Sequence, residues 1–356
     1  MDNIENRIKI DDLKEFCENS LIKEGMNKKD ACIVSEVLVE TDAFGVHSHG
    51  SKNLHNYIRK LRVGGMVLNT RTELVKEGPA FAIIDAKDSF GIIASYKAME
   101  LACEKAKEMG IAIVCVKKSS HFGPAGYYAN MAAKQGMLGI SVSNVDPNMT
   151  VPGARGMLIG NNPFAYAAPA ITVPTIFLDI AMSSVASLKV IQARKEKKVI
   201  PDNWIVDGEG IPTTNPGQYP EVGAMQPMAG HKGYGLAVLV ELLTGVLSGG
   251  SMSMMGDIVS WCFELEKTNN VCHSFIVIDV EKFIGREEFV TRIEKMSLRL
   301  RSATKAKGKD KIYTPGEIEW NKYKKAKSEG IVLPSDVFDA LMDLHKENGI
   351  PIKWVS

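Results

Sequence analysis

The run IAIVCV at residues 111–116 is short, almost wholly apolar and bounded by helical patterns. LGISVS at 138–143 and TIFLDI at 175–180 repeat these features. Strands that are covered by helices on both faces have this composition. FAIID at 81–85 and FIVID at 275–279 predict two further strands. Together the runs predict an α/β protein with a three-layer centre.

Helical periodicity fills most of the remaining chain. The region 9–63 carries apolar residues at helical spacing, and Gly64-Gly65 ends it. Four further helical segments are predicted, at 89–109, 232–247, 286–304 and 317–348.

Domain boundaries are expected where Gly and Pro gather, in the segments 64–79 and 308–316. We therefore predict a helical domain made from both chain ends, residues 1–75 with 318–356. The central α/β domain would span residues 76–317.

The composition is that of an ordinary globular protein, with 45% hydrophobic and 24% charged residues among 356. Lys and Arg (43) balance Asp and Glu (42), so no net charge favours nucleic acid or an acidic membrane surface. The charged start, MDNIENRIKIDDLKEF, lacks the pattern of a secretory signal, and the apolar stretch 233–250 contains Glu241. We expect a cytoplasmic protein with no nucleic-acid or membrane partner.

The six cysteines form no CxxC pair and no zinc-ligand spacing, so we expect reduced thiols and no metal site. No G-x-G-x-x-G follows a predicted strand, and Walker A, H-E-x-x-H and G-x-S-x-G motifs are absent too. Common nucleotide-binding and hydrolase signatures are therefore excluded.

Two histidine clusters stand in loops before predicted helices. HSHG occupies 47–50, where acid/base chemistry and a helix cap by Ser48 with solvated histidines are equally good interpretations. SSHFGPAGYYA at 119–129 follows a buried strand, and Pro124 suits the first turn of the next helix. His121 thus lies at the carboxyl end of a strand, where ligand sites of open α/β sheets gather, and we prefer a functional role for it over packing.

Four other polar clusters accompany the histidines. SNVDP (143–147) ends the next strand, and two of these turns follow strands that we expect to lie side by side, although turn chemistry alone also explains Asn and Asp before Pro. LDIAMSS (178–184) offers close backbone approach and hydroxyl donors. HKGYG (231–235) puts Lys232 at a helix start, where a cation does not help the helix but favours bound anions. YTPGE (313–317) fits a simple turn as well.

Taken in order along the chain, seven motifs resemble those of the malate/L-lactate dehydrogenase family that lacks a Rossmann fold. They are TDAFGVHSHG, SSHFGPAGYYA, GNNPFAYAAP, LDIAMS, IPDNWIVDGEGIPTTNP, HKGYGLAVLVELLTGVLSG and YTPGE. The resemblance covers about residues 40–350. It implies NAD(P)-dependent oxidation of small 2-hydroxy acids, or the reverse reduction, in a homodimer with its active site between domains. It also implies a mixed central sheet with non-Rossmann cofactor binding and a helical domain from both chain ends.

The resemblance also implies roles for individual residues. His121 and His49 would share the acid/base work of hydride transfer, since removal of a hydride from a hydroxyl carbon requires removal of the hydroxyl proton. Ser48 and Asp146 would join them as catalytic candidates, and Tyr57 would face the substrate. The implied cofactor residues are Asp179, Ile180, Ala181, Met182, Ser183, Ser184, Lys232, Pro315, Gly316 and Glu317.

Three positions depart from the family pattern. Asn53 replaces an arginine that suits a carboxylate clamp, and Lys52 or Arg155 are the candidate substitutes. Leu188 stands where relatives have glycine before Lys189, and PGARG (152–156) replaces a P-x-G-G turn.

The leading hypothesis is a malate/oxaloacetate oxidoreductase that uses NAD, with NADP still open. Ureidoglycolate, lactate or diketogulonate-type substrates are alternatives within the same family. Two hypotheses outside this family compete with it. One is a metal-dependent hydrolase that uses His47, His49, His121 and His231, and the other is a catalytically silent binding protein.

Overall fold

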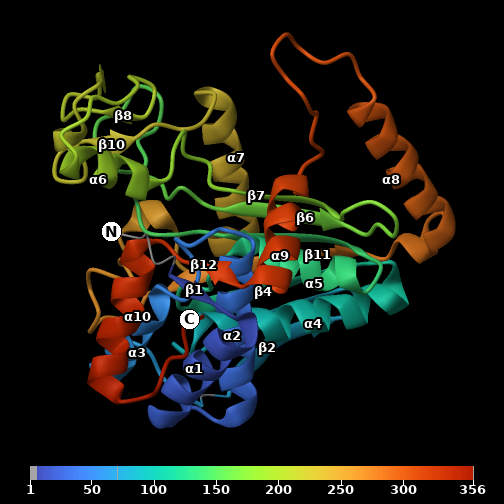
Figure 1. The fold of residues 1–356 in the computed structure, drawn as a ribbon, viewed down its shortest axis with the longest axis horizontal. Coiled ribbons are helices and arrows are strands. Elements are labelled where there is room, and N and C mark those ends of the chain that lie inside the picture. The colour runs from blue at the N-terminus through green and yellow to red at the C-terminus, as the bar shows by residue number, and fades with distance from the viewer. Residues whose placement is uncertain (1–5, 70, 356) are drawn as a thin grey trace.

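A seven-stranded mixed sheet forms the centre of the molecule, in a computed structural model that describes residues 6–69 and 71–355 (Figure 1). Among the described strands, β3 and β4 are the only parallel neighbours in this sheet. All five predicted strands are confirmed. In spatial order the strands are β2 (Glu73–Gly78), β3 (Phe81–Asp85), β4 (Ile111–Ser119), β11 (Val271–Ile278), β5 (Leu138–Ser143), β6 (Phe164–Ala168) and β7 (Ile176–Ile180).

The late strand β11 lies between β4 and β5, so the expectation that these two strands are neighbours was wrong. Phe275 of β11 pairs with Val114 on one side and with Ser141 on the other. Because β11 is antiparallel to both, β4 and β5 still point the same way. Their carboxyl ends therefore reach the same edge of the sheet, where His121 and the 143–147 turn follow.

Helices cover both faces of this sheet, which confirms the three-layer α/β prediction. On one face lie α4 (Gly91–Met109) and α5 (Ala125–Lys134); on the other lie α7 (His231–Glu241) and the π-helical turn Leu242–Val246 that continues it (Figure 1). The helix α8 (Arg286–Arg301) and the loop after it extend away from this body.

Both chain ends are helical and lie together, as predicted. The N-terminal part contributes α1 (Ile10–Lys23), α2 (Lys28–Ala43) and α3 (Asn53–Arg62). The C-terminal part contributes α9 (Glu317–Glu329) and α10 (Ser335–Asn348), so the helical stretch predicted at 317–348 is confirmed and consists of two helices with a break at 330–334. Gly330, with φ +90°, ends α9, and β12 (Ile331–Val332) then pairs with β1 (Arg7–Ile8).

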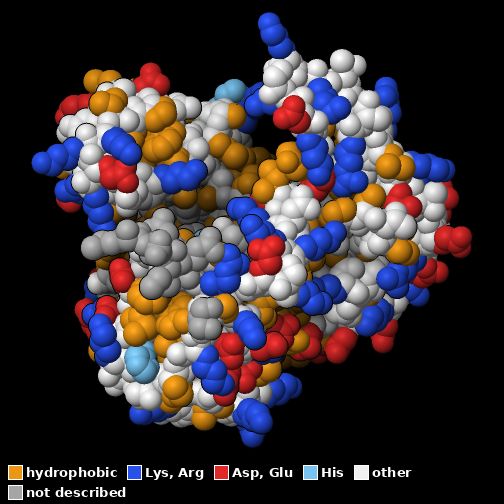
Figure 2. All heavy atoms as spheres, in the orientation of Figure 1, with side chains coloured by type: hydrophobic (Ala, Val, Ile, Leu, Met, Phe, Trp, Pro, Cys, Tyr) orange, Lys and Arg blue, Asp and Glu red, His pale blue; other side chains and the backbone are white. Residues whose placement is uncertain are grey.

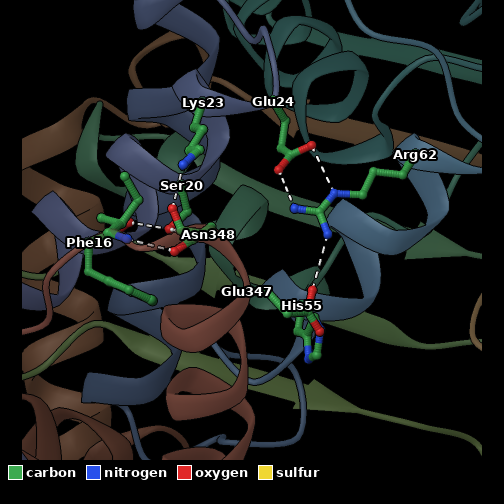
Figure 3. Close-up of polar contacts among 9 residues, drawn as sticks. Phe16, Ser20, Lys23, Glu24, His55, Arg62, Glu347 and Asn348 are labelled. Carbon is green, nitrogen blue, oxygen red and sulfur yellow. Dashed lines mark hydrogen bonds and ion pairs between the residues drawn. The ribbon is translucent and has the colours of Figure 1, made fainter.

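Polar contacts join the two ends across α1, α3 and α10 (Figure 3). Asn348 donates to the Ser20 hydroxyl at 3.0 Å, and Lys23 donates to the Asn348 carbonyl oxygen. Arg62 bridges Glu24 (2.6 Å) and Glu347 (3.1 Å). These helices share one hydrophobic core with α4 and α5. The domain boundaries at 75 and 317 stay a prediction, and residues 1–5, 70 and 356 of that division lie outside the described residues.

A smaller lobe projects beside α7 and has its own core, which includes Met149, Ile205 and Met225 (Figure 1). The sequence analysis predicted none of its short strands, nor β2 and β6, because their apolar runs are too brief or too exposed to produce a period. The lobe contains α6 (Ser187–Lys195), β8 (Ile205–Val206), β9 (Pro212–Thr213) and β10 (Ala224–Met225), with a 3₁₀ turn at Pro216–Gln218. Two more 3₁₀ turns, Ser253–Met255 and Val280–Lys282, flank β11.

No helix within the described residues has both the length and the hydrophobicity needed to cross a bilayer. Glu241, which made the stretch 233–250 too polar for a membrane span, is 2% exposed. Its carboxylate accepts hydrogen bonds from the side-chain amides of Asn144 (3.2 Å) and Asn162 (3.0 Å) and from the Ser253 hydroxyl. The buried carboxylate thus ties α7 to the turns that follow β5 and precede β6.

Glu241→Leu is expected to lower the free energy of unfolding by about 3–5 kcal/mol, since it leaves several buried donors without an acceptor. Equilibrium urea unfolding measures the loss. The exposed Glu104→Leu on α4 is the control and should change stability by about 0.5 kcal/mol or less. Equal losses in the two variants would show that the Glu241 contacts contribute nothing.

Candidate active site

The two histidine motifs meet at the edge of the sheet where β4 and β5 end. His121 follows β4, and His49 comes from the loop between α2 and α3. Their rings are stacked with centroids 5.8 Å apart. Residues 72 positions apart in the sequence therefore share one site, as the sequence analysis expected.

His121 is held from several directions. The Tyr57 hydroxyl of α3 shares a hydrogen bond of 2.6 Å with His121 Nδ1. The indole of Trp261 stacks on the imidazole at 4.2 Å, with the two planes 9° apart. The His121 backbone N–H donates to Asn269 Oδ1 at 3.3 Å. No hydrogen bond to His121 Nε2 is assigned among the described residues.

His49 is oriented by its neighbour Ser48, whose hydroxyl shares a 2.9 Å hydrogen bond with His49 Nδ1. Asn53 donates its side-chain amide to the Ser48 carbonyl oxygen at 2.9 Å. Asn53 is 6% exposed, so this amide supports the loop that carries His49. The helix-cap interpretation of Ser48 is wrong, because no side-chain cap bond precedes α3.

Asp42, which the sequence analysis did not single out, holds the HSHG loop by two hydrogen bonds. Its buried carboxylate accepts from His47 Nδ1 at 2.8 Å and from the Ser51 backbone N–H at 2.8 Å. A Cβ on Gly50 would lie 2.2 Å from Asp42 Oδ1, so only glycine allows the loop to pass this close. The available signal was the acidic residue in TDAFGVHSHG, five positions before His47.

Burial controls the charge of this site. It lowers the pKa of His49 below 6.5. The pKa of His121 is lowered further, first by burial and then by His49 and His273. Burial raises the pKa of the Tyr57 phenol well above its ordinary value. At neutral pH the site therefore presents two neutral imidazoles and a neutral phenol.

The other predicted catalytic and substrate residues lie in different surroundings. Burial, with Glu264 as a minor cause, raises the pKa of Asp146 to about 6, and no described contact joins its carboxylate to either histidine. Lys52 pairs with Asp336 of α10 at 2.5 Å, and the exposed Arg155 pairs with Glu209 at 2.8 Å. Both candidate carboxylate clamps therefore have a carboxylate partner of their own chain.

Asp179, the first predicted cofactor residue, accepts from the Gly126 N–H at 2.7 Å, at the start of α5. Burial raises its pKa to about 6. Ile180 ends β7 and Ala181 follows it. Backbone bonds then join Met182 to Asn161 and Met228, and both Ser183 and Ser184 donate their hydroxyls to backbone carbonyls.

The remaining cofactor candidates occupy two helix starts. Lys232 is the exposed second residue of α7. Pro315 accepts from the Phe177 N–H, and Gly316 has φ +83° with no room for a Cβ against Phe177. Glu317 binds Lys311 (2.8 Å) and Arg301 (3.0 Å); burial opposes its ionisation, but these cations and Thr314 lower its pKa to about 2. Glu317 therefore organises its own turn.

A small pocket lies beside the histidine loops. Its lining includes Val46, three residues before His49, and Pro124, three residues after His121. Asp179 of β7 and Asn130 of α5 line it too. Asn130 is 1% exposed, and neither its amide nitrogen nor its oxygen has a hydrogen-bond partner among the described residues. Because buried amides are almost always bonded, this orphaned pair is a feature that a bound group would satisfy.

Sequence reasoning missed three residues of this edge: Trp261, Asn269 and His273. His273 of β11 is fully buried and bridges the hydroxyls of Ser143 (2.8 Å) and Ser119 (2.9 Å) on the two flanking strands. The available signal was the run NNVCHS, which places polar residues directly before the predicted strand FIVID.

The described residues contain no cluster of three or more His, Cys, Asp or Glu that could hold a metal ion. His47 is bonded to Asp42 and His49 to Ser48, while His231 opens α7. The four histidines of the hydrolase hypothesis therefore do not form one ligand set.

Comparison with known proteins agrees with this geometry. Residues 8–342 match the sequence model of the malate/L-lactate dehydrogenase family. A malate dehydrogenase of Pyrococcus horikoshii is 38% identical, over 97% of both chains. An L-sulfolactate dehydrogenase of Methanocaldococcus jannaschii is 34% identical (98% of this chain, 97% of the relative), and a ureidoglycolate dehydrogenase (NAD(+)) of Escherichia coli is 34% identical (94% and 95%).

Solved structures superpose over nearly the whole chain. The Pyrococcus horikoshii malate dehydrogenase has a TM-score of 0.89 at 36% identity, covering 98% of this chain and 97% of its own. The Methanocaldococcus jannaschii sulfolactate dehydrogenase has a TM-score of 0.90 at 33% identity, covering 97% and 98%. Fold and site thus define a hydroxy acid dehydrogenase. The chain belongs to the malate/L-lactate dehydrogenase family, as its motifs indicated.

The buried histidines predict acid sensitivity. Burial lowers the pKa of His273 to about 3, so the folded protein keeps it neutral while the unfolded chain takes up a proton below about pH 6.5. Its stabilising contribution is complete above pH 6.5 and is lost as the pH falls towards 3. From pH 7 to pH 5 this one residue should cost about 2 kcal/mol of unfolding free energy.

His273→Gln should remove that part of the loss, as measured by urea unfolding at pH 7 and pH 5. His231→Gln, at an exposed histidine, is the matched control and should keep the native pH dependence. If His273→Gln and the native protein lose equal stability, His273 is not the group that titrates.

Proposed function

We propose that this enzyme transfers a hydride between the nicotinamide of NAD(P) and a small 2-hydroxy or 2-oxo acid, with malate and oxaloacetate as the leading pair. The observation that carries the proposal is the pair of partly buried imidazoles, His49 and His121, whose ring centroids are 5.8 Å apart. The most similar relatives reported above, two dehydrogenases of malate and sulfolactate, support the substrate class.

His121 is the proposed acid/base. In oxidation the carbon of the alcohol loses a hydride and its hydroxyl loses a proton, and His121 Nε2 accepts that proton. In the tautomer that does this, Nδ1–H donates to the Tyr57 oxygen, which holds the ring in place. The same hydrogen bond then stabilises the imidazolium that forms. In reduction the imidazolium returns the proton to the oxygen.

His49 is the proposed partner on the substrate oxygen. Ser48 fixes its Nδ1, so Nε2 is free to orient or polarise the hydroxyl or carbonyl group. Lys52 is the candidate for the substrate carboxylate, because its ion pair with Asp336 is exposed and such pairs exchange easily. Ureidoglycolate, lactate and diketogulonate-type acids remain the alternative substrates. The reason is that Asn53 stands where family members have an arginine suited to binding the substrate carboxylate.

The pocket that Asn130 lines has a volume of only about 20 Å³, room for little more than a water molecule. It has room for the primary amide of a nicotinamide cofactor but not for its ring, and that amide would satisfy both orphaned atoms of Asn130, the donor nitrogen and the acceptor oxygen. Asp179 lines the same pocket, so its carboxylate is a second candidate hydrogen-bond acceptor for the cofactor amide. When bound, the cofactor supplies the hydride acceptor. Lys232, at the start of α7, is the proposed phosphate contact.

The first test follows NADH and NADPH absorbance with a panel of 2-oxo acids that includes oxaloacetate. His121→Ala should lower kcat/KM about 100-fold or more while cofactor still binds, because general acid/base catalysis is lost. For oxidation the native kcat/KM should fall as the pH drops through the lowered histidine range, whereas for reduction it should fall as the pH rises. The His121 variant should lose this limb and His49→Ala should keep it at a reduced rate.

Native-like rates in both single variants would refute the assignment of both histidines. An inverted pattern, in which only the His49 variant loses the limb, would exchange their roles. Oxidation of neither cofactor by any acid of the panel would leave the silent binding protein as the better hypothesis.

Cofactor binding is tested separately by NADH fluorescence. Asn130→Leu and Lys232→Ala should each raise the dissociation constant about tenfold, since each loses a hydrogen bond or charge contact. Lys189→Ala, in α6, is a lysine control that no proposed contact involves. An unchanged constant for either variant removes that residue from the cofactor site.

We also propose a cytoplasmic homodimer. Large apolar side chains of α7 and its extension are about half exposed, and Figure 2 shows hydrophobic side chains over α7 in the hollow beside the α8 arm. A second copy would cover this surface. Light scattering at micromolar concentration should give twice the chain mass, and a monomer mass would contradict the dimer. The apolar residues are Leu236, Leu239, Leu242, Val246 and Leu247.

A further inference from the structure

The segment 257–270, here called the Trp261 loop, leads from the 3₁₀ turn Ser253–Met255 to β11 and covers His121. Trp261 stacks on the His121 ring at 4.2 Å and lies 5.1 Å from the Tyr57 ring. Asn269 of the same loop binds the His121 backbone. The loop has no helix or strand of its own, and hydrogen bonds between Asn269 and Val259 join its two ends.

Lys60 of α3 binds the backbone of this loop. The residue is fully buried, and its Nζ donates to three backbone carbonyl oxygens: Glu264 at 3.1 Å, Leu265 at 3.3 Å and Lys267 at 2.5 Å. An ammonium group has three N–H donors, so all of them are used on one turn of the Trp261 loop. A buried cation with carbonyl partners only is unusual, since buried lysines normally pair with a carboxylate.

Gly65 is a second, independent contact with the same turn. A Cβ at this position would lie 1.8 Å from the Leu265 carbonyl oxygen and 3.0 Å from that of Lys267. The end of α3 and the loop are therefore packed backbone against backbone, around the Lys60 ammonium.

One helix thus reaches His121 by two routes. Tyr57 and Lys60 are three residues apart, so they share a face of α3. Tyr57 binds His121 directly, and Lys60 binds the loop that stacks Trp261 on it. We propose that Lys60 is a positioning residue for hydride transfer, which holds the Trp261 indole against His121 and so keeps the acid/base imidazole fixed and shielded from water on the face that the indole covers.

The chemical consequence concerns the proton affinity of His121. The titratable groups that face its ring are Tyr57 of α3, His49 of the HSHG loop and His273 of β11. Burial is the largest cause of its lowered pKa. If the indole moves away, water reaches the ring, and the pKa of His121 should rise towards the ordinary value of about 6.5.

The test uses Lys60→Met, which keeps the length of the apolar stem but has no donor. Diethyl pyrocarbonate modifies neutral imidazoles, and peptide mass mapping gives the rate at His121 itself without any substrate. We expect the His121 rate to rise at least tenfold and the midpoint of its pH dependence to move upward. His273, which is fully buried within β11, should stay unmodified and so reports that the fold is intact.

Lys105→Met is the matched control. Lys105 is also largely buried, with Nζ bonded to the Gly78 carbonyl (2.9 Å) and to Glu77 (2.7 Å), but it lies on α4. It should leave the His121 rate unchanged. Gly65→Ala places a Cβ against the same turn and should therefore reproduce the Lys60→Met result. It replaces Lys60→Met in the test if that variant does not fold.

The activity arm is a double-mutant cycle with Trp261→Leu. Lys60→Met and Trp261→Leu should each lower kcat/KM for the acid that the native enzyme prefers by about 10-fold to 100-fold, as expected for a misplaced catalytic group. Both should shift the acid limb upward. The double variant should resemble Trp261→Leu alone, because Lys60 acts through the indole.

Three results would overturn the proposal: native labelling of His121 in both Lys60→Met and Gly65→Ala, equal increases at His121 and His273, or additive losses in the cycle. The inference rests on the role of His121 proposed above. If the native protein reduces none of the acids in the panel, the proposed function fails, while the labelling comparison still decides whether Lys60 holds the Trp261 loop.

Discussion

The buried carboxylate of Glu241 is the interaction on which the arrangement of the site edge depends. It accepts hydrogen bonds from Asn144 after β5, from Asn162 before β6 and from Ser253 before the Trp261 loop. Asn144 and Asn162 lie outside helices and strands, and Ser253 only opens a 3₁₀ turn, so side-chain bonds take the place of a backbone ladder here. One acidic residue of α7 thereby fixes the layer above the sheet, the turn that carries Asp146 and the start of the loop that reaches His121.

Burial then sets the chemistry at this edge. The pKa values of His49, His121 and His273 are lowered chiefly because burial disfavours the charged ring, and His49 and His273 lower that of His121 further. A neutral imidazole is the form that can accept a hydroxyl proton, which suits a dehydrogenase. The cost is acid sensitivity, since three neutral histidines favour the unfolded chain once the pH falls below about 6.5.

Much of the layer structure was predictable because it depends on local patterns. The runs at 81–85 and 138–143 match β3 and β5 residue for residue, and the helix predicted at 89–109 begins only two residues late. The strand order was not predictable, because β11 enters between β4 and β5 from more than 120 residues further along the chain. Strand pairing depends on hydrogen bonds between distant segments, which leave no periodic trace in either one.

The sequence by itself determined the family, the three layers and the two histidines, since motifs and apolar periods are properties of the chain. Only the tertiary structure decided what surrounds those histidines. From the sequence, Lys60 would be predicted to be a surface cation of an amphipathic helix. In the structure it is buried, and its Nζ donates to the carbonyl oxygens of Glu264, Leu265 and Lys267. The physical reason is that backbone carbonyls bind a cation whatever their side chains are, so no residue pattern records the contact.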